Sequence, residues 1–150
     1  LLLIDEKDNF EYFCHKYNFS NKLKKDLSLI AKNYIKFKDD KNFLKKDLKK
    51  NIYILGKINV KKLIAFIYCA EKKFTFNLLK QTIYEVDNMK IPNFVFNGQY
   101  LIGQGLPKGK KIGFALKELE KKWIENNFNL KDKEVISIVN RVKKLNIFNI

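Results

Sequence analysis

The sequence contains few of the residues on which disulfide-stapled domains, metal sites and membrane spans depend. Its 150 residues include two cysteines and one histidine. Two thiols, Cys14 and Cys69, provide no disulfide framework and fit a reducing compartment such as the cytoplasm. His15 with these two thiols cannot complete a Cys/His zinc site. No stretch approaches the roughly 20 apolar residues that cross a bilayer, so we expect no membrane partner.

The chain also lacks an initiator methionine and a secretory signal. It begins Leu1-Leu2-Leu3-Ile4 and continues with two acidic residues, where a signal peptide would carry basic ones. We therefore expect this chain to be a segment of a longer polypeptide.

Basic residues, by contrast, are in large excess. Lys and Arg number 31 against 16 Asp and Glu, which gives a net charge of +15, and every basic residue except Arg141 is lysine. Because 46% of the residues are hydrophobic, the chain is a folded domain rather than a disordered tail. The surplus lies mainly in residues 21–62, net +10, and residues 108–123, net +4. This clustering predicts a polyanionic partner.

The hydrophobic periodicity predicts helices for most of the chain. Expected helix starts are capped by Ser20, Asn59, Thr75 and Asp132, and Gly56 is expected to end a single helix over 44–55. The other expected helices cover 7–17, 20–37, 60 to about 70, 112–123 and 132–145, and one more begins at Thr75 and ends before Pro92. The helix that begins at 60 is apolar on nearly all sides, which is typical of a central, buried helix.

These elements predict an all-α fold, an array of about seven or eight helices in helical hairpins. Residues 1–88 form the first region. Residues 89–150 contain a Gly/Pro-rich loop, which precedes the penultimate long helix, and the last helices. We expect the two regions to pack as one continuous unit.

The Gly/Pro-rich loop is the most informative segment. Residues 103–111 read Gly-Gln-Gly-Leu-Pro-Lys-Gly-Lys-Lys, which fits neither a dinucleotide fingerprint nor a P-loop. Glycine allows the backbone to approach a ligand, and the start of the following helix attracts an anion. With Lys108, Lys110 and Lys111 beside it, the segment suits a phosphate group. The alternative is a helix–helix turn that needs glycine for steric reasons.

A second basic group lies upstream of this loop. The lysines that could line a phosphate backbone there are Lys22, Lys24, Lys25, Lys45, Lys46, Lys49 and Lys50. The alternative is an ordinary solvated helix face. The seven tyrosines could stack on bases, although Tyr34 and Tyr68 lie on apolar faces and are predicted core residues, as is Trp123.

Catalytic and metal-binding residues are not predicted in this chain. Cys14 and His15 are neighbours in sequence, which is not the geometry of a nucleophile and its base. Glu118 and Glu120 lie two apart on a helix and do not share a face. His15 is expected at the surface.

Residues 96–125 resemble a signature near the C-terminus of bacterial class II CCA-adding enzymes, the tRNA nucleotidyltransferases related to bacterial poly(A) polymerases. The family pattern runs roughly Gly-x-Asp-Leu, then Gly, Pro-x-Gly-Pro, Ile-Gly and Leu-x-x-Leu-Glu. The matching positions are Gly98, Leu101, Gly105, Pro107, Gly109, Ile112, Gly113, Leu116, Leu119 and Glu120. Tyr100 replaces the family's Asp, which removes a helix cap, and Lys110 replaces its second Pro.

The resemblance implies that this chain is the helical body and tail, which holds tRNA around its acceptor arm and elbow. The catalytic head and neck, which would use Mg²⁺ with CTP and ATP to add CMP and AMP to the tRNA 3′ end, are absent from these residues. Gly98, Gly105 and Gly109 join the lysines as expected RNA-binding residues. Two alternatives stay open: the same region of a poly(A) polymerase, and a stand-alone helical RNA-binding protein without catalysis.

Overall fold

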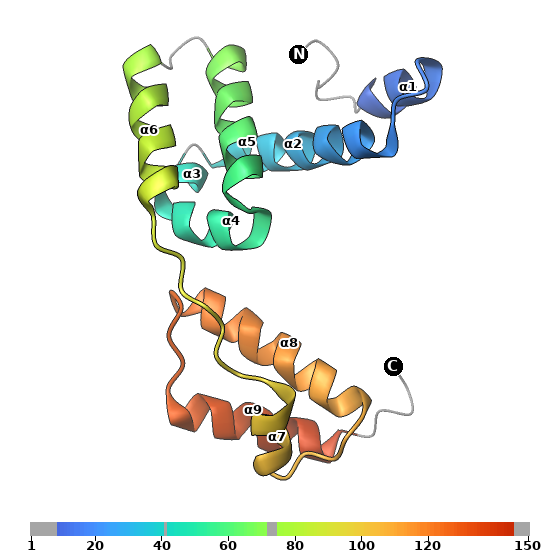
Figure 1. The fold of residues 1–150 in the computed structure, drawn as a ribbon, viewed down its shortest axis with the longest axis vertical. Helices are drawn as coiled ribbons and strands as arrows, with labels where there is room; N and C mark the ends of the chain where they lie inside the picture. Colours follow the sequence, from blue (N-terminus) through green and yellow to red (C-terminus); the bar gives the residue numbers. More distant parts are fainter. Residues whose placement is uncertain (1–8, 41, 72–74, 146–150) are drawn as a thin grey trace. The chain divides into compact units, whose positions relative to one another are not determined.

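The described part of the protein is built from α-helices and connecting segments. The computed structural model describes residues 9–40, 42–71 and 75–145, and the secondary structure elements in these ranges are all α-helices (Figure 1). They are α1 (Asn9–Lys16), α2 (Asn21–Asp39), α3 (Phe43–Lys46), α4 (Leu48–Leu55), α5 (Lys57–Ala70), α6 (Phe76–Asn88), α7 (Gly98–Gly103), α8 (Lys110–Glu125) and α9 (Asp132–Lys144). The predicted all-α fold class is confirmed.

The chain divides into two compact units, Leu1–Ile91 and Pro92–Ile150. The boundary lies three residues after position 88, where the sequence placed it. The described helices α1–α6 belong to the first unit and α7–α9 to the second. The expected packing of both regions as one continuous unit stays a prediction.

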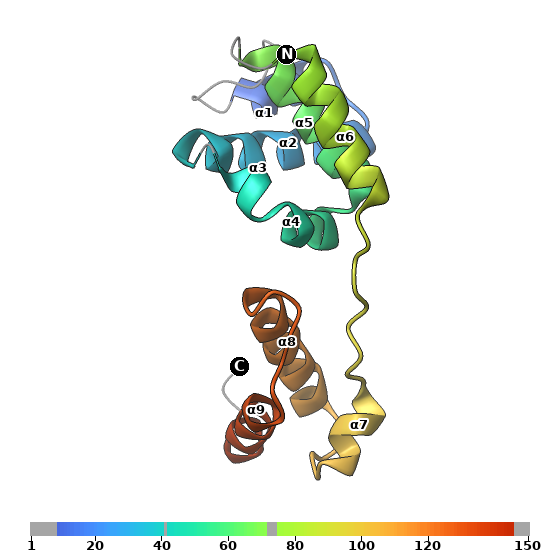
Figure 2. The same cartoon turned by 90° about the vertical axis from the view of Figure 1, so that its left-hand side faces the viewer.

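Helix α5 is the centre of the first unit, as its apolar residues predicted. It packs against α2, α4 and α6, and Figure 2 shows α5 and α6 side by side. Val60, Leu63 and Ile67 of α5 are fully buried. Phe37 of α2 and Val86 of α6 complete the same core cluster.

Two of the predicted caps are confirmed. The hydroxyl of Ser20 accepts a hydrogen bond from the Leu23 N–H at the start of α2, at 3.3 Å. The Thr75 hydroxyl accepts one from the Leu78 N–H at the start of α6, also at 3.3 Å. Each satisfies a backbone donor that has no partner inside its helix. Leu23, which the periodicity placed on the inward face, is exposed.

The single helix predicted over 44–55 is wrong, because α3 and α4 are separated at Asp47. Asp47 is not helical, with φ of −117°, and occupies the position before α4. Aspartate is a poor residue for a helix interior and a good one just before a helix, which accounts for the break. The Nζ of Lys50 lies 3.3 Å from its carboxylate.

The predicted cap Asn59 is also wrong, because α5 begins two residues earlier, at Lys57. Gly56, with φ of +81°, both ends α4 and precedes α5. The Asn59 amide donates a hydrogen bond to the Leu55 carbonyl at 2.8 Å. Asn59 therefore satisfies the end of α4 instead of the start of α5.

The second unit has a core of its own around α7, α8 and α9. Leu101, Leu119 and Val142, one from each helix, are fully buried. Trp123 is also buried, as predicted, and its ring meets those of Phe94 and Phe128 with centroids 5.4 and 4.9 Å apart.

Helices α8 and α9 form an antiparallel hairpin. The Lys111 Nζ, at the start of α8, donates to the Lys143 carbonyl near the end of α9 at 2.8 Å. At the other end, the Asn126 amide after α8 donates to Glu134 near the start of α9 at 2.9 Å. Each end of the hairpin therefore combines the start of one helix with the end of the other.

Asp132, the predicted cap of α9, is instead the first residue of that helix. The residue before it is Lys131, whose N–H donates to the Glu134 carboxylate at 3.0 Å. This backbone hydrogen bond, followed by the one from Asn126, holds the pKa of Glu134 below its usual value. The free backbone N–H before α9 is thus bonded by the carboxylate of Glu134, which lies one turn inside the helix.

Candidate nucleic-acid interface

The lysines predicted from residues 21–62 do not form one group. Lys22, Lys24 and Lys25 lie in the first turns of α2, whereas the other four follow its opposite end, on α3 and α4. With 19 residues, α2 is about 28 Å long at 1.5 Å per residue. The structure therefore separates these lysines into two groups.

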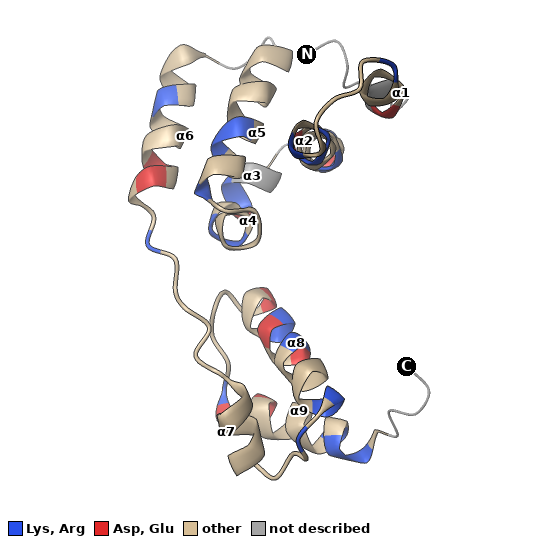
Figure 3. Cartoon of the chain, turned by 45° about the vertical axis from the view of Figure 1, so that its right-hand side comes forward, with Lys and Arg blue, Asp and Glu red and all other residues tan. Residues whose placement is uncertain are grey.

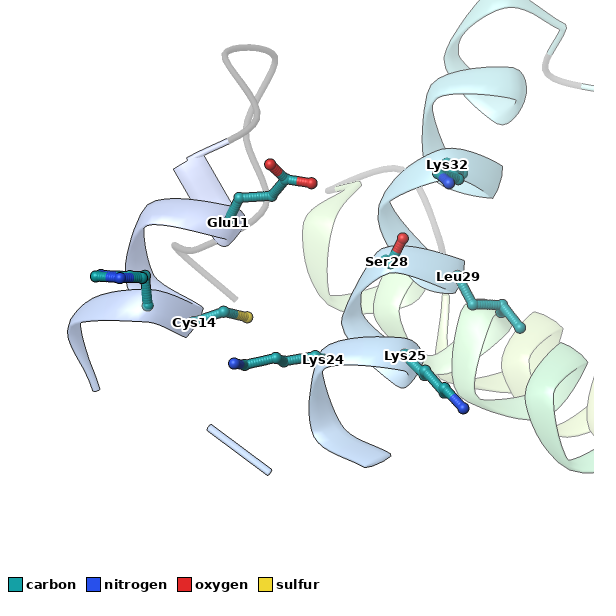
Figure 4. A pocket seen from close by; sticks show the side chains of 8 residues that line it. Glu11, Cys14, Lys24, Lys25, Ser28, Leu29 and Lys32 are labelled. Carbon is teal, nitrogen blue, oxygen red and sulfur yellow. The ribbon is translucent and has the colours of Figure 1, made fainter. Parts of the chain in front are cut away.

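The first group borders an open pocket between α1 and α2. Lys24, Lys25 and Lys32 of α2 line this depression of about 580 Å³ (Figure 4). Buried Cys14 and exposed His15 line its α1 side, with Glu11 as the one acidic lining residue. Among the described residues none of the three lysines makes an ion pair, so the pocket is cationic.

The second group is partly neutralised within the first unit. Lys50 pairs with Asp47. Lys45 borders a separate cavity of about 430 Å³ whose walls are mostly apolar side chains of the core. Lys45, Lys46 and Lys49 are exposed. Lys50 is therefore less available to a phosphate than Lys45 and Lys46.

One of the predicted glycines, Gly105, has a turn role that explains it without a ligand. Gly105, with φ of +82°, follows α7 in a left-handed turn closed by a hydrogen bond from the Leu106 N–H to the Leu101 carbonyl. This arrangement is typical of a glycine-terminated helix. The steric alternative considered for the loop thus accounts for Gly105. A Cβ on Gly98 would lie 3.4 Å from Cγ2 of Ile112, which is close to an ordinary contact distance, so packing against α8 does not by itself require this glycine.

The start of α7 is capped in spite of Tyr100. The Asn97 side chain accepts a hydrogen bond from the Tyr100 N–H at 2.9 Å. The sequence comparison with the family pattern suggested a lost cap at position 100. Asn97, three residues earlier, caps the helix instead. The sequence feature that could have predicted this cap is an Asn directly before the first residue of the helix.

A concentration of positive charge lies at one end of the α8–α9 hairpin. Lys108, Lys110 and Lys111 stand at the start of α8, and Lys143 and Lys144 at the end of α9. Figure 3 shows these blue segments together. A Cβ on Gly105 would lie 3.1 Å from the Lys143 Nζ, which places this ammonium beside the glycine-rich turn. We call these five lysines the basic end.

Within the described part of the chain, no acidic side chain pairs with the basic end. The first turn of α8 has none, and none of the five lysines makes an ion pair among the described residues. The opposite end of the hairpin differs, because residues 121–134 contain four lysines against three acids. The free N–H groups at the start of α8 add further attraction for an anion. The basic end is therefore the best candidate phosphate-binding surface of the second unit.

Sequence reasoning found three lysines of this surface and missed Lys143 and Lys144. Their only sequence signal was a basic last turn in the final helix, which is also an ordinary way to end a helix. Arg141, one turn earlier, is part of an ion pair with Glu118. The antiparallel hairpin was needed to bring the end of α9 to the start of α8.

Gly109 has a conformation that only glycine adopts readily. Its φ of +124° and ψ of −154° lie outside the regions open to other residues. Nothing lies within 4 Å of an added Cβ, so a substitution meets backbone strain and no collision.

We expect Gly109→Val to destabilise the second unit by about 1–3 kcal/mol, measured by urea unfolding followed by circular dichroism. The control is Gly113→Ala. Gly113 lies inside α8 with open space around it, so this change should be neutral or stabilising by about 0.5–1 kcal/mol. Equal stability of the Gly109→Val variant and the parent would show that position 109 does not require a backbone conformation restricted to glycine.

The described residues offer no further chemistry of the kinds considered. They contain no group of three or more His, Cys, Asp or Glu side chains placed to hold a metal ion. His15 is exposed as expected, and Cys14 beside it is buried. Within the described residues, no helix combines the length and apolar character that a bilayer-spanning segment needs.

Comparison with known proteins gives no match: no family model, no curated protein and no solved structure is significantly similar to this chain. Residues 96–125, together with the charge and geometry of the basic end, are therefore the features that indicate a function.

Proposed function

We propose that this chain is the tRNA-holding helical part of a CCA-adding tRNA nucleotidyltransferase. In this proposal the chain binds the acceptor arm and elbow of tRNA. Addition of CMP and AMP, with Mg²⁺, CTP and ATP, belongs to a separate catalytic part. The described residues do not provide a carboxylate cluster for Mg²⁺, and no step of nucleotide addition is assigned to them.

The observation that carries the proposal is the net positive charge of the basic end, which lies beside the segment that resembles the family signature. Four lysines from α8 and α9 lie there with Lys108 of the preceding loop, next to the free N–H groups of α8, and none of the five makes an ion pair among the described residues. Lysine side chains and helix starts contact phosphate oxygens, and such contacts position RNA without reading its sequence. A folded RNA of constant shape and variable sequence, such as tRNA, suits this kind of recognition.

The proposal is tested by comparing RNAs of different shape at equal charge. We expect the chain to bind a tRNA transcript more tightly than an unstructured RNA of the same length, measured by fluorescence anisotropy over a salt series. Affinity for tRNA should fall steeply with salt, because lysine–phosphate contacts release counterions. Equal affinity for both RNAs would favour a general RNA-binding protein. Absence of RNA binding would contradict the proposal.

The lysines of α3 and α4 should contribute less than their number suggests. Changing Lys45, Lys46, Lys49 and Lys50 together to Glu is expected to weaken tRNA binding. It should also reduce the slope of log affinity against log salt by at most about 3, because Asp47 already competes for Lys50.

Asp47→Asn is the matched control for this prediction. It keeps a residue suited to the start of α4 and releases Lys50, so the same slope should steepen by about 1. Both variants are measured on the salt series used for the parent chain. An unchanged slope in the four-lysine variant would remove α3 and α4 from the interface.

A further inference from the structure

The turn between α1 and α2 holds a row of aromatic rings. Phe13 and Tyr17 are nearly parallel, with an interplanar angle of 10° and centroids 5.9 Å apart. Tyr17 and Phe19 continue the row at 6.3 Å and 25°. Tyr12 meets the edge of Phe13 at 5.7 Å. We call these four residues the aromatic row.

The backbone fixes the aromatic row before any ligand arrives. The N–H groups of Tyr17 and Phe19 donate to the carbonyls of Phe13 and Cys14 at 3.0 and 3.1 Å. Asn18 between them has a φ of +48°, a left-handed conformation that asparagine tolerates better than most residues. Phe19 also packs against the buried pair Cys14 and Ala31. A preformed surface of this kind loses little conformational entropy on binding.

Two rings of the row stay open to solvent. The exposed fraction is 61% for Tyr12 and 57% for Tyr17, whereas Phe13 and Phe19 are half-buried. The two exposed rings are tyrosines and the two half-buried rings are phenylalanines. A tyrosine ring presents an apolar face together with a hydroxyl that stays hydrated, which suits a surface that faces a ligand.

Positive charge accompanies the exposed rings. The Lys16 Nζ lies 5.7 Å from the ring centroids of both Tyr12 and Tyr17. It makes no ion pair among the described residues. Residues 11–25 contain four lysines against one acid, Glu11, and the cationic pocket of Figure 4 adjoins this turn through Cys14 and His15. Aromatic faces with ammonium groups beside them complement a nucleotide, whose base stacks while its phosphate pairs with lysine.

We infer that the aromatic row is a stacking site for an unpaired base of the bound RNA. This inference rests on the proposed function and adds to it a contact that depends on a base and not on a phosphate. Tyr12 and Tyr17 provide the stacking faces, and Lys16 provides the charge for the attached backbone. Among the described tyrosines, Tyr84 is as exposed but has no ring partner or lysine beside its ring, so it serves as the comparison.

The experiment compares a short oligoadenylate with an abasic strand of the same length, both labelled and titrated with the full chain. The parent should bind the base-bearing strand more tightly. Tyr17→Leu and Tyr12→Leu should each weaken binding of the oligoadenylate by about five- to hundredfold, the range measured for loss of one stacked base. Binding of the abasic strand should not change.

Two further variants separate stacking from folding. Tyr17→Phe keeps the ring and should bind oligoadenylate like the parent, and Tyr84→Leu should also bind normally. Circular dichroism checks that each variant keeps its helices. Equal loss of affinity for both strands, or no loss in either leucine variant, would overturn the stacking site. Binding of neither tRNA nor the abasic strand by the parent would instead overturn the proposed function.

Discussion

Neutralising Lys108, Lys110, Lys143 and Lys144 together by change to Gln is expected to lower the salt slope of tRNA binding by about 3–4. The rule behind this number is a slope of about 0.9 for each phosphate contact on a duplex. Between 50 and 200 mM salt, the parent would then lose on the order of a hundredfold more affinity than the variant. At low salt the parent should bind far more tightly.

The expected effect is large because binding a phosphate does not require these lysines to break an ion pair. Four ammonium groups at the basic end make no ion pair among the described residues, and the nearby N–H groups of α8 favour the same ligand. Glutamine keeps the length of the side chain without placing a negative charge at the end of α9, where it would weaken the helix. The variant should therefore stay folded, which circular dichroism can check.

The matched control changes four lysines that lie outside the basic end. Two are in the middle and last part of α8, and two are at the start of α9. Lys117, Lys121, Lys131 and Lys133 are exposed lysines of the same unit, and their change to Gln alters the net charge by the same amount. Because residues 121–134 also contain three acids, this variant should change the slope by less than 1. Equal slopes in the two variants would mean that only net charge matters, and the basic end would not be a site.

Replacing Trp123 by alanine is expected to cost the second unit about 3–5 kcal/mol of unfolding free energy. Trp123 is buried, and its ring contacts Phe94, which precedes α7, and Phe128, which lies in the turn between α8 and α9. Aromatic pairs contribute about 0.5–1.5 kcal/mol beyond the area they bury. For a unit as long as Pro92–Ile150 the whole stability is about 3–9 kcal/mol, so one substitution can unfold it.

Urea unfolding followed by circular dichroism measures this loss. Trp123→Phe is the graded control, because it keeps one aromatic ring against Phe94 and Phe128 and should cost less. Leu119→Ala gives a second measurement with the only tryptophan in place. It removes a fully buried side chain, should cost about 2–5 kcal/mol, and should shift the Trp123 emission to the red at lower urea. A loss below about 1 kcal/mol for Trp123→Ala would mean that this ring is not part of a packed core.

The helices could be predicted where their signals are local. The hydroxyls of Ser20 and Thr75 cap the helices that directly follow them, and α5 is apolar on so many sides that its central place follows. Asn59 was misplaced because a short polar side chain can satisfy the end of one helix as well as the start of the next. Which of these it does depends on how the two helices meet, and the periodicity does not contain that information.

The candidate site could be predicted only in part for a similar reason. Lys108, Lys110 and Lys111 are close in sequence to a helix start, so a local argument finds them. Lys143 and Lys144 join them only through the hairpin, and Asn97 replaces a cap that the family pattern places at Tyr100. The aromatic row was hidden because exposed and buried tyrosines look alike in sequence.

The hydrogen bond from Lys111 to the Lys143 carbonyl has a consequence for an approaching anion. In an antiparallel hairpin, the carbonyl end of α9 lies beside the N–H end of α8, and its partial negative charge would repel a phosphate that the neighbouring end attracts. The Lys111 ammonium covers one of these carbonyls and so screens that repulsion. In the proposed function, Lys111 would therefore favour a bound phosphate through this screening as well as through its own charge.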